Sequence, residues 1–105
     1  MTQTDKATSE LLTQKDRQEL RILTFLGLAT KAGKTVSGAD AVSEAVVRDC
    51  AYLVLVAEDA SEGTSKKIAF LSRQAGVSFC RFSTRQKLGK FLGKDDRAVA
   101  AVLDK

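Results

Sequence analysis

Residues 27–35 read GLATKAGKT and end in Gly-Lys-Thr, the tripeptide that closes a phosphate-binding P-loop. That loop also needs a glycine five positions before the Gly-Lys pair, so that successive backbone N–H groups surround the phosphates. Here that position is Leu28, and Gly27 comes one residue too early. A P-loop leads from a strand into a helix, whereas the apolar residues before this segment recur at helical spacing. We therefore interpret Gly33 as the C-cap of a helix and not as part of a nucleotide site.

The second half of the chain is basic. Residues 1–65 contain 7 Lys or Arg and 10 Asp or Glu, a net charge of −3, and residues 66–105 contain 10 and 3, a net charge of +7. Such a cluster suits a polyanion, because neutralising its phosphates releases counterions. A solvated surface that keeps the protein soluble is the alternative interpretation. The cations of the densest stretch are Arg81, Arg85, Lys87, Lys90, Lys94 and Arg97.

The residue types needed for catalysis or metal binding are not grouped in this sequence. It has no histidine, no glycine-framed nucleophile beside a base and no evident pair of catalytic carboxylates, so we expect no enzyme and no catalytic residues. Cys50 and Cys80 lack other ligands for a metal, and we expect neither metal nor cofactor. We expect both cysteines and Tyr52 to lie in the core, although a disulfide between the cysteines stays open.

The chain shows no sign of a membrane or secreted location. Its longest apolar run, residues 51–57, is too short to cross a bilayer, and no secretory signal opens the sequence. We expect a cytoplasmic protein without membrane contact.

Helical and strand patterns alternate along the chain, separated by glycines and N-cap residues. This order predicts the α/β class, as a three-layer α-β-α sandwich with a four-stranded mixed sheet. We expect a polar N-terminal tail at residues 1–12 and a single domain at residues 13–105. The apolar segment YLVLV is expected at the centre of the sheet, covered by helices on both sides. The expected helices are 14–32 (with Thr13 as N-cap), 37–49, 59–76 and 83–93, and the expected strands are 34–36, 52–56, 77–82 and 98–103.

Two further patterns predict how the helices are fixed. Ser37, Asp59 and Ser83 each precede an acidic or amide residue by three positions, the spacing of a capping box, so we expect them to be N-caps. The first helix carries an apolar stripe that we expect to face the core. Its members are Leu20, Ile22, Leu23, Phe25, Leu26 and Ala29.

Four segments occur in an informative order: GLATKAGKTVSG (27–38), YLVLVAEDAS (52–61), the Leu-Gly pair at 88–89 and RAVAAV (97–102). In these segments the chain resembles the ribosomal protein L7Ae family, whose members bind kink-turn RNA, and specifically its small bacterial, YlxQ-like branch. The resemblance implies a non-enzymatic protein that binds structured RNA, a kink-turn or ribosomal RNA, in connection with the ribosome or translation. We expect a monomer that does not bind DNA.

The resemblance also implies a two-part RNA site. The turn into the second helix would meet sheared G·A pairs, and the loop before the last strand would cover a flipped-out nucleotide. Asp40, Ala41 and Glu44 replace the family's usual Asn, Glu and Lys, which leaves two carboxylates one helical turn apart on the RNA-facing side. The implied RNA-binding residues are Lys34, Ser37, Gly38, Ala39, Asp40, Ala41, Ser43, Glu44 and Arg48 in and around the first part, and Gly93, Lys94, Asp95, Asp96 and Arg97 in the second.

Two other functions fit the same sequence. The first is a protein-interaction or assembly subunit that kept the fold and lost its affinity for RNA. The second is kinship with the similar RNA-docking domain of some RNA methyltransferases, against which the lack of an attached catalytic domain argues. Gly38 and Asp40 also have ordinary structural interpretations, as a tight-turn residue and a capping residue.

Overall fold

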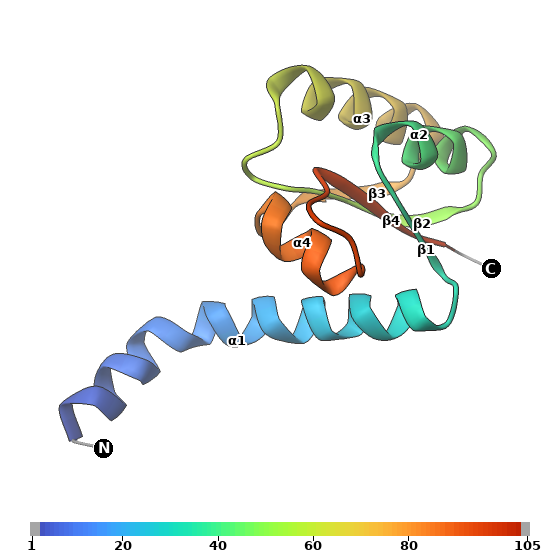
Figure 1. The fold of residues 1–105 in the computed structure, drawn as a ribbon. Helices are drawn as coiled ribbons and strands as arrows, with labels where there is room; N and C mark the ends of the chain where they lie inside the picture. Colours follow the sequence, from blue (N-terminus) through green and yellow to red (C-terminus); the bar gives the residue numbers. More distant parts are fainter. Residues whose placement is uncertain (1–2, 104–105) are drawn as a thin grey trace.

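A computed structural model shows an α/β fold in which a four-stranded sheet lies between two layers of helices (Figure 1). It describes the backbone of residues 3–103 and the side chains from residue 14 to residue 103. The predicted fold class is thereby confirmed. The elements in chain order are α1 (Gln3–Lys31), β1 (Thr35–Ser37), α2 (Ala39–Val47), β2 (Ala51–Val56), α3 (Glu62–Ala75), β3 (Ser78–Arg81), α4 (Arg85–Phe91) and β4 (Val99–Leu103).

The sheet is mixed, with the strand order β1-β4-β2-β3. Strand β4 is antiparallel to both β1 and β2, whereas β2 and β3 run parallel. The two inner strands are therefore the last strand of the chain and the predicted central segment YLVLV. Because β4 lies between β1 and β2, the segment that enters β4 is brought beside the segment that leaves β1.

The inner strands divide the apolar residues between two cores. Val54 and Val56 of β2 pack with α2 and α3, while the intervening Leu55 packs with α1 and α4. Strand β4 alternates in the same way. This period of two, with apolar residues on both faces, is what a sheet covered by helices on each side requires.

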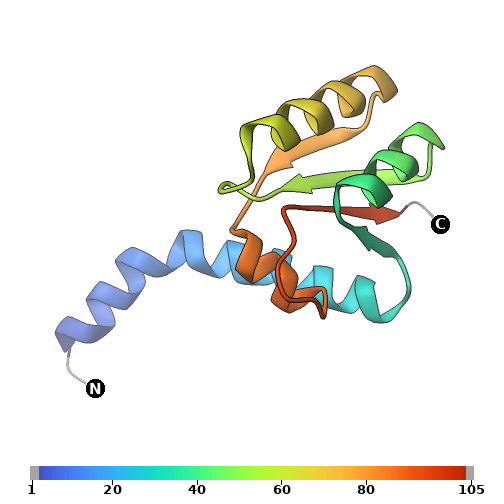
Figure 2. The ribbon, with the colours of Figure 1, turned by 45° about the horizontal axis from the view of Figure 1, so that its top comes forward.

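Helix α1 differs from the prediction in its start and in its buried face. It begins at Gln3, so Thr13 lies inside the helix and is not an N-cap. Figure 2 shows its first turns projecting beyond the sheet. Of the predicted core stripe, Leu23 and Leu26 are buried, whereas three members are exposed because α1 meets the sheet and α4 along only a narrow face. The exposed members are Leu20, Ile22 and Phe25.

The C-terminus of α1 confirms the interpretation of Gly33. This glycine has φ 73°, and the N–H of Lys34 donates to the carbonyl of Ala29 at 2.8 Å. The N–H of Gly33 donates to the carbonyl of Thr30 at 3.0 Å, which completes a Schellman motif. The Gly-Lys-Thr segment therefore leads from a helix into a strand, the opposite of the P-loop order.

The three N-caps predicted from capping boxes were wrong by one or two residues. Helix α2 begins after Gly38, α3 is capped by Ser61, and α4 is capped by Thr84. The hydroxyls of Ser61 and Thr84 each accept a hydrogen bond from a first-turn N–H at 3.2 Å, which is the ordinary function of these residues.

Two of the three residues that were predicted as caps, Asp59 and Ser83, have other positions and contacts in the fold. The Asp59 carboxylate accepts a hydrogen bond from the N–H of Arg85 at 2.9 Å, at the start of α4. Ser83 is buried with φ 61° and joins β3 to α4. The third candidate, Ser37, bonds a distant arginine, as described below.

The cysteines and Tyr52 were wrongly placed in the core. Cys50 and Cys80 are free and exposed, and 67% of Tyr52 is accessible. Cys80 lies on the edge strand β3, where partial burial of its thiol raises the pKa. Less of the reactive thiolate therefore exists at a given pH.

Within residues 3–103, no helix is long and apolar enough to cross a membrane. Among the described side chains, no group of three or more His, Cys, Asp or Glu could hold a metal ion.

Candidate nucleic-acid interface

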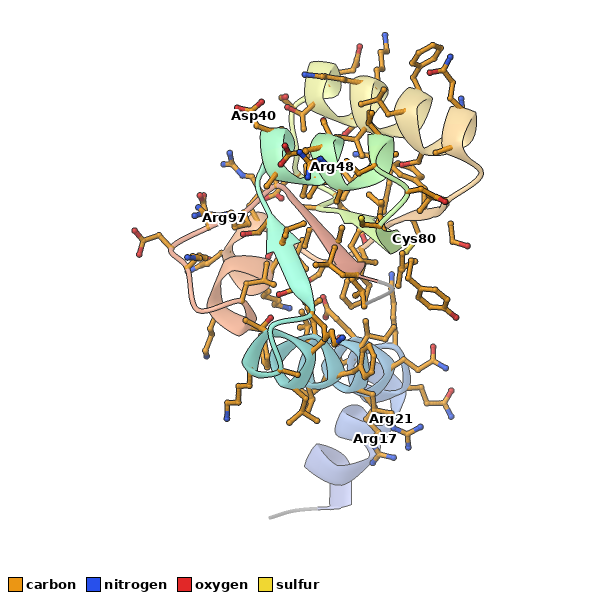
Figure 3. The ribbon with its side chains drawn as sticks, turned by 90° about the vertical axis from the view of Figure 1, so that its right-hand side faces the viewer. Arg17, Arg21, Asp40, Arg48, Cys80 and Arg97 are labelled. Atoms are coloured by element: carbon orange, nitrogen blue, oxygen red, sulfur yellow. The ribbon has the colours of Figure 1, made fainter. Side chains whose placement is uncertain are left out.

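The end of β1 and the approach to β4 meet through an arginine and a serine. The guanidinium Nε of Arg97 donates a hydrogen bond to the Ser37 hydroxyl at 3.1 Å, and Nη1 donates to the carbonyl of Asp96 at 2.9 Å. Ser37 pairs with Ala100 in the antiparallel register of β1 and β4, which is why these segments are neighbours. Figure 3 shows Arg97 on the same side of the molecule as Asp40.

Gly38 sets the direction of α2. Its φ of 92° is one that residues with a side chain rarely adopt, and its N–H donates to the carbonyl of Val99 at 2.9 Å. No side chain of the described residues caps the first turn of α2. The turn thus presents backbone N–H groups and the partial positive charge of the helix to an incoming anion.

The loop from Gly93 to Arg97 is fastened to α4. The N–H of Lys94 donates to the carbonyl of Gly89 at 2.8 Å, and the N–H of Arg97 donates to the carbonyl of Arg85 at 3.0 Å. A Cβ atom at Gly89 would lie 2.5 Å from the Cα of Asp96, so only glycine permits this approach. The Leu-Gly pair at 88–89 therefore positions the loop.

A depression of about 440 Å³ lies between the turn and the loop. Part of its wall is a pair of hydroxyls: Thr30 Oγ1 and Thr35 Oγ1 are 2.9 Å apart. Thr30 also donates to the carbonyl of Leu26 at 2.8 Å, so Thr35 must be the donor within the pair. The depression is lined by Thr30, Thr35, Val36, Ser37, Ala41, Leu92, Gly93, Lys94 and Arg97.

The prediction from sequence missed four of these lining residues: Thr30, Thr35, Val36 and Leu92. They belong to the end of α1, to β1 and to the end of α4, and only the folded chain brings them together. Three of them, Thr30, Thr35 and Val36, lie in the segment GLATKAGKTVSG, and this segment was the sequence signal that could have identified them.

The two carboxylates of α2 have different surroundings. Glu44 lies 3.6 Å from the guanidinium of Arg48, in an exposed ion pair one helical turn apart. No described side chain forms an ion pair or hydrogen bond with Asp40, which is exposed in the first turn. Asp40 is therefore the carboxylate that a bound polyanion would meet without a compensating cation.

The sequence profile of the ribosomal protein L7Ae/L30e/S12e/Gadd45 family matches residues 21–105 of this chain. The chain belongs to this family. It is 41% identical over 80 residues to the RNA-binding protein YlxQ of Bacillus subtilis, an alignment that covers 76% of this chain and 80% of the relative. It therefore falls in the YlxQ-like branch of the family.

Two more distant comparisons agree. The large ribosomal subunit protein eL8 of the archaeon Cenarchaeum symbiosum is 33% identical over 84 residues, covering 79% of this chain and 67% of that protein. A solved structure of a protein of unknown function from Bacillus halodurans superposes with a TM-score of 0.75 at 33% identity. That superposition covers 78% of this chain and 83% of the other.

In this family member, most of the predicted site residues lie around the depression or beside it. Ser37, Gly38, Ala39, Asp40 and Ala41 form the turn and the first turn of α2, and Gly93, Lys94, Asp95, Asp96 and Arg97 form the loop.

Four predicted residues lie elsewhere or are otherwise engaged. Lys34 is at the opposite end of β1 from the turn, and Arg48 caps the C-terminus of α2, where it pairs with Glu44. Ser43 Oγ is buried without a hydrogen-bond partner among the described residues, so its hydroxyl does not face the surface. The assignment of these residues as RNA contacts remains a prediction.

Proposed function

We propose that this chain is a non-enzymatic RNA-binding protein that recognises a kinked, structured RNA, in association with the ribosome or translation. The observation that carries the proposal is the hydrogen bond between Arg97 and Ser37. It holds the loop that carries Lys94 and Arg97 beside an uncapped helix N-terminus, the two parts that a sharply bent RNA backbone would need to contact together.

The names of the relatives support RNA as the partner. The Bacillus subtilis relative is called an RNA-binding protein, and the archaeal relative is a large ribosomal subunit protein. The first is 41% identical to this chain over most of both sequences.

Each part of the site has a distinct chemical function in this proposal. The N–H groups of the first turn of α2 bind a phosphate or the acceptor edge of a base. Lys94 and Arg97 neutralise phosphates, and the depression between the turn and the loop receives an unstacked nucleotide. Asp40, which forms no ion pair with a described side chain, repels the phosphates and lowers the affinity.

A salt titration tests the proposal. The expected result is a steep loss of affinity for structured RNA as salt rises, roughly tenfold between about 50 and 200 mM for two phosphate contacts and roughly a hundredfold for four. Affinity for a folded RNA that does not change with salt, or no affinity at all, would contradict it. The latter result would favour the protein-interaction subunit.

A further inference from the structure

Helix α1 carries an exposed apolar face. Leu20, Phe25 and Leu28 are 55%, 56% and 61% accessible, although each is a large hydrophobic residue. Their spacing of three to five positions places them on one side of the helix, turned away from Leu23 and Leu26 in the core. Clustered exposed apolar residues of this size mark an interaction surface more often than chance.

Together with two arginines and Thr24, these residues line a shallow, open depression on the outer face of α1, with no wall from a second element of the described chain. The depression has a volume of about 470 Å³ and is lined by Arg17, Leu20, Arg21, Thr24, Phe25 and Leu28. It runs about 12 Å along α1 from Leu20 to Leu28, since each helical residue advances the chain by about 1.5 Å. We call it the α1 groove.

The α1 groove is separate from the proposed RNA site. Figure 3 shows Arg17 and Arg21 well apart from Arg97 and Asp40. Three of its six lining residues are large and apolar, and it has no glycine-rich turn. A nucleic acid would leave Leu20 and Leu28 in contact with phosphate or water, which favours a protein partner.

The charges of the α1 groove indicate the charge that the partner's surface should carry. Neither Arg17 nor Arg21 forms an ion pair with a described side chain, and no carboxylate lines the groove. A second copy of this chain, packed antiparallel on the same face, would bring Arg17 and Arg21 toward Lys31 of its partner and oppose cation to cation. An acidic partner would satisfy both arginines.

We propose that the α1 groove docks an acidic amphipathic helix of another protein. Such a helix would place apolar anchors at i, i+4 and i+7 against Leu20, Phe25 and Leu28, and Asp or Glu on its flanks against Arg17 and Arg21. Apolar contact supplies the affinity, and the charges select the partner and its orientation.

The test uses a synthetic helical peptide with a Leu stripe flanked by Glu, and a matched peptide in which Lys replaces Glu. Binding to the full chain is followed by fluorescence anisotropy, and backbone amide shifts locate the contact. The Glu peptide should bind at least about tenfold more tightly than the Lys peptide and shift the amides around Leu20, Phe25 and Leu28.

Two pairs of variants control for folding and for general charge. Phe25→Asp should weaken binding of the Glu peptide at least about tenfold. Phe70→Asp should not weaken it, because Phe70 is equally exposed (59% accessible) but lies on α3, outside the proposed surface. Arg21→Glu should weaken binding of the Glu peptide by a similar factor, whereas Arg73→Glu on α3 should leave that binding unchanged.

Several outcomes would overturn the proposal. Equal affinity for the two peptides, absence of binding or amide shifts confined to other elements would each do so. A dimer in analytical ultracentrifugation that Phe25→Asp dissociates would assign the α1 groove to a second copy. Amide shifts in α1 on addition of RNA, with none on addition of peptide, would assign it to nucleic acid.

Discussion

Arg97 and Ser37 are 60 positions apart in the sequence, and the guanidinium of one donates a hydrogen bond to the hydroxyl of the other at 3.1 Å. This contact orients a half-buried arginine across the entrance to α2. The hydrogen bond is a structural reason for a donor side chain at position 97, independent of any contact with RNA. The two functions can be separated by comparing stability with affinity.

Arg97→Gln removes the charge but keeps a side chain that can hydrogen-bond. RNA affinity should fall about tenfold at moderate salt, and the slope of log affinity against log salt should become shallower by about one unit, because one phosphate contact is lost. The free energy of unfolding should change by only about 1 kcal/mol, the net contribution of a hydrogen bond.

The matched control for Arg97→Gln is Arg73→Gln, which removes the same charge from the exposed surface of α3. It should change neither the affinity nor the slope. Equal effects of the two substitutions would mean that Arg97 contributes only to the overall charge.

Gly89→Ala tests whether α4 positions the loop. The added Cβ would lie 2.5 Å from the Cα of Asp96 and 2.7 Å from the carbonyl oxygen of Asp95, so the loop must move. Overpacking of this kind should destabilise the fold by about 1–3 kcal/mol and weaken RNA binding, as measured by urea unfolding and filter binding.

Gly63→Ala is the control for Gly89→Ala, because nothing lies within 4 Å of a Cβ at Gly63 in α3. It should stabilise the protein by up to about 1 kcal/mol through helix propensity and leave RNA binding unchanged. If Gly89→Ala bound RNA as the unmodified chain does, the loop would not need its present position.

Asp40→Lys tests the electrostatic cost of the uncompensated carboxylate. It should strengthen RNA binding about tenfold, because a repulsive charge at the turn becomes an attractive one. Glu62→Lys makes the same change of charge in the first turn of α3, where it also breaks the ion pair with Lys66, and it should leave RNA binding unchanged. Its unfavourable effect on the helix dipole, about 0.3–1 kcal/mol, is similar. Weaker binding by Asp40→Lys would indicate that the carboxylate accepts a hydrogen bond from a base.

The order of the elements was predictable because local patterns determine it. The segment YLVLV is apolar on both faces and lies between helices, and Gly33 ends its helix with a positive φ value as expected. These features depend on residues that are close in the sequence, so they can be predicted from the sequence alone.

The caps were less predictable because distant residues compete for the same side chains. Ser37 bonds Arg97 and Asp59 bonds the N–H of Arg85, so neither hydroxyl nor carboxylate serves its own helix. The hydrogen bond between Arg97 and Ser37 also joins the two parts of the candidate site. The sequence predicted each part, but it did not predict this contact between them.

The basic surface was overestimated for a similar reason. Lys87 lies 3.4 Å from a carboxylate oxygen of Glu19, and Arg85 lies 3.9 Å from Asp59 and 4.0 Å from Asp96. Counting charges along the chain could not reveal these pairs between distant elements.

The most direct test of the account is a gel-shift comparison of two RNAs: a kink-turn duplex, and the same duplex with its bulge removed. The account predicts tighter binding to the kink-turn by at least about tenfold, because only the bent RNA can reach both the turn at Gly38 and the loop at Arg97. Equal affinity for the two duplexes would contradict it, since the protein would then bind RNA through charge alone.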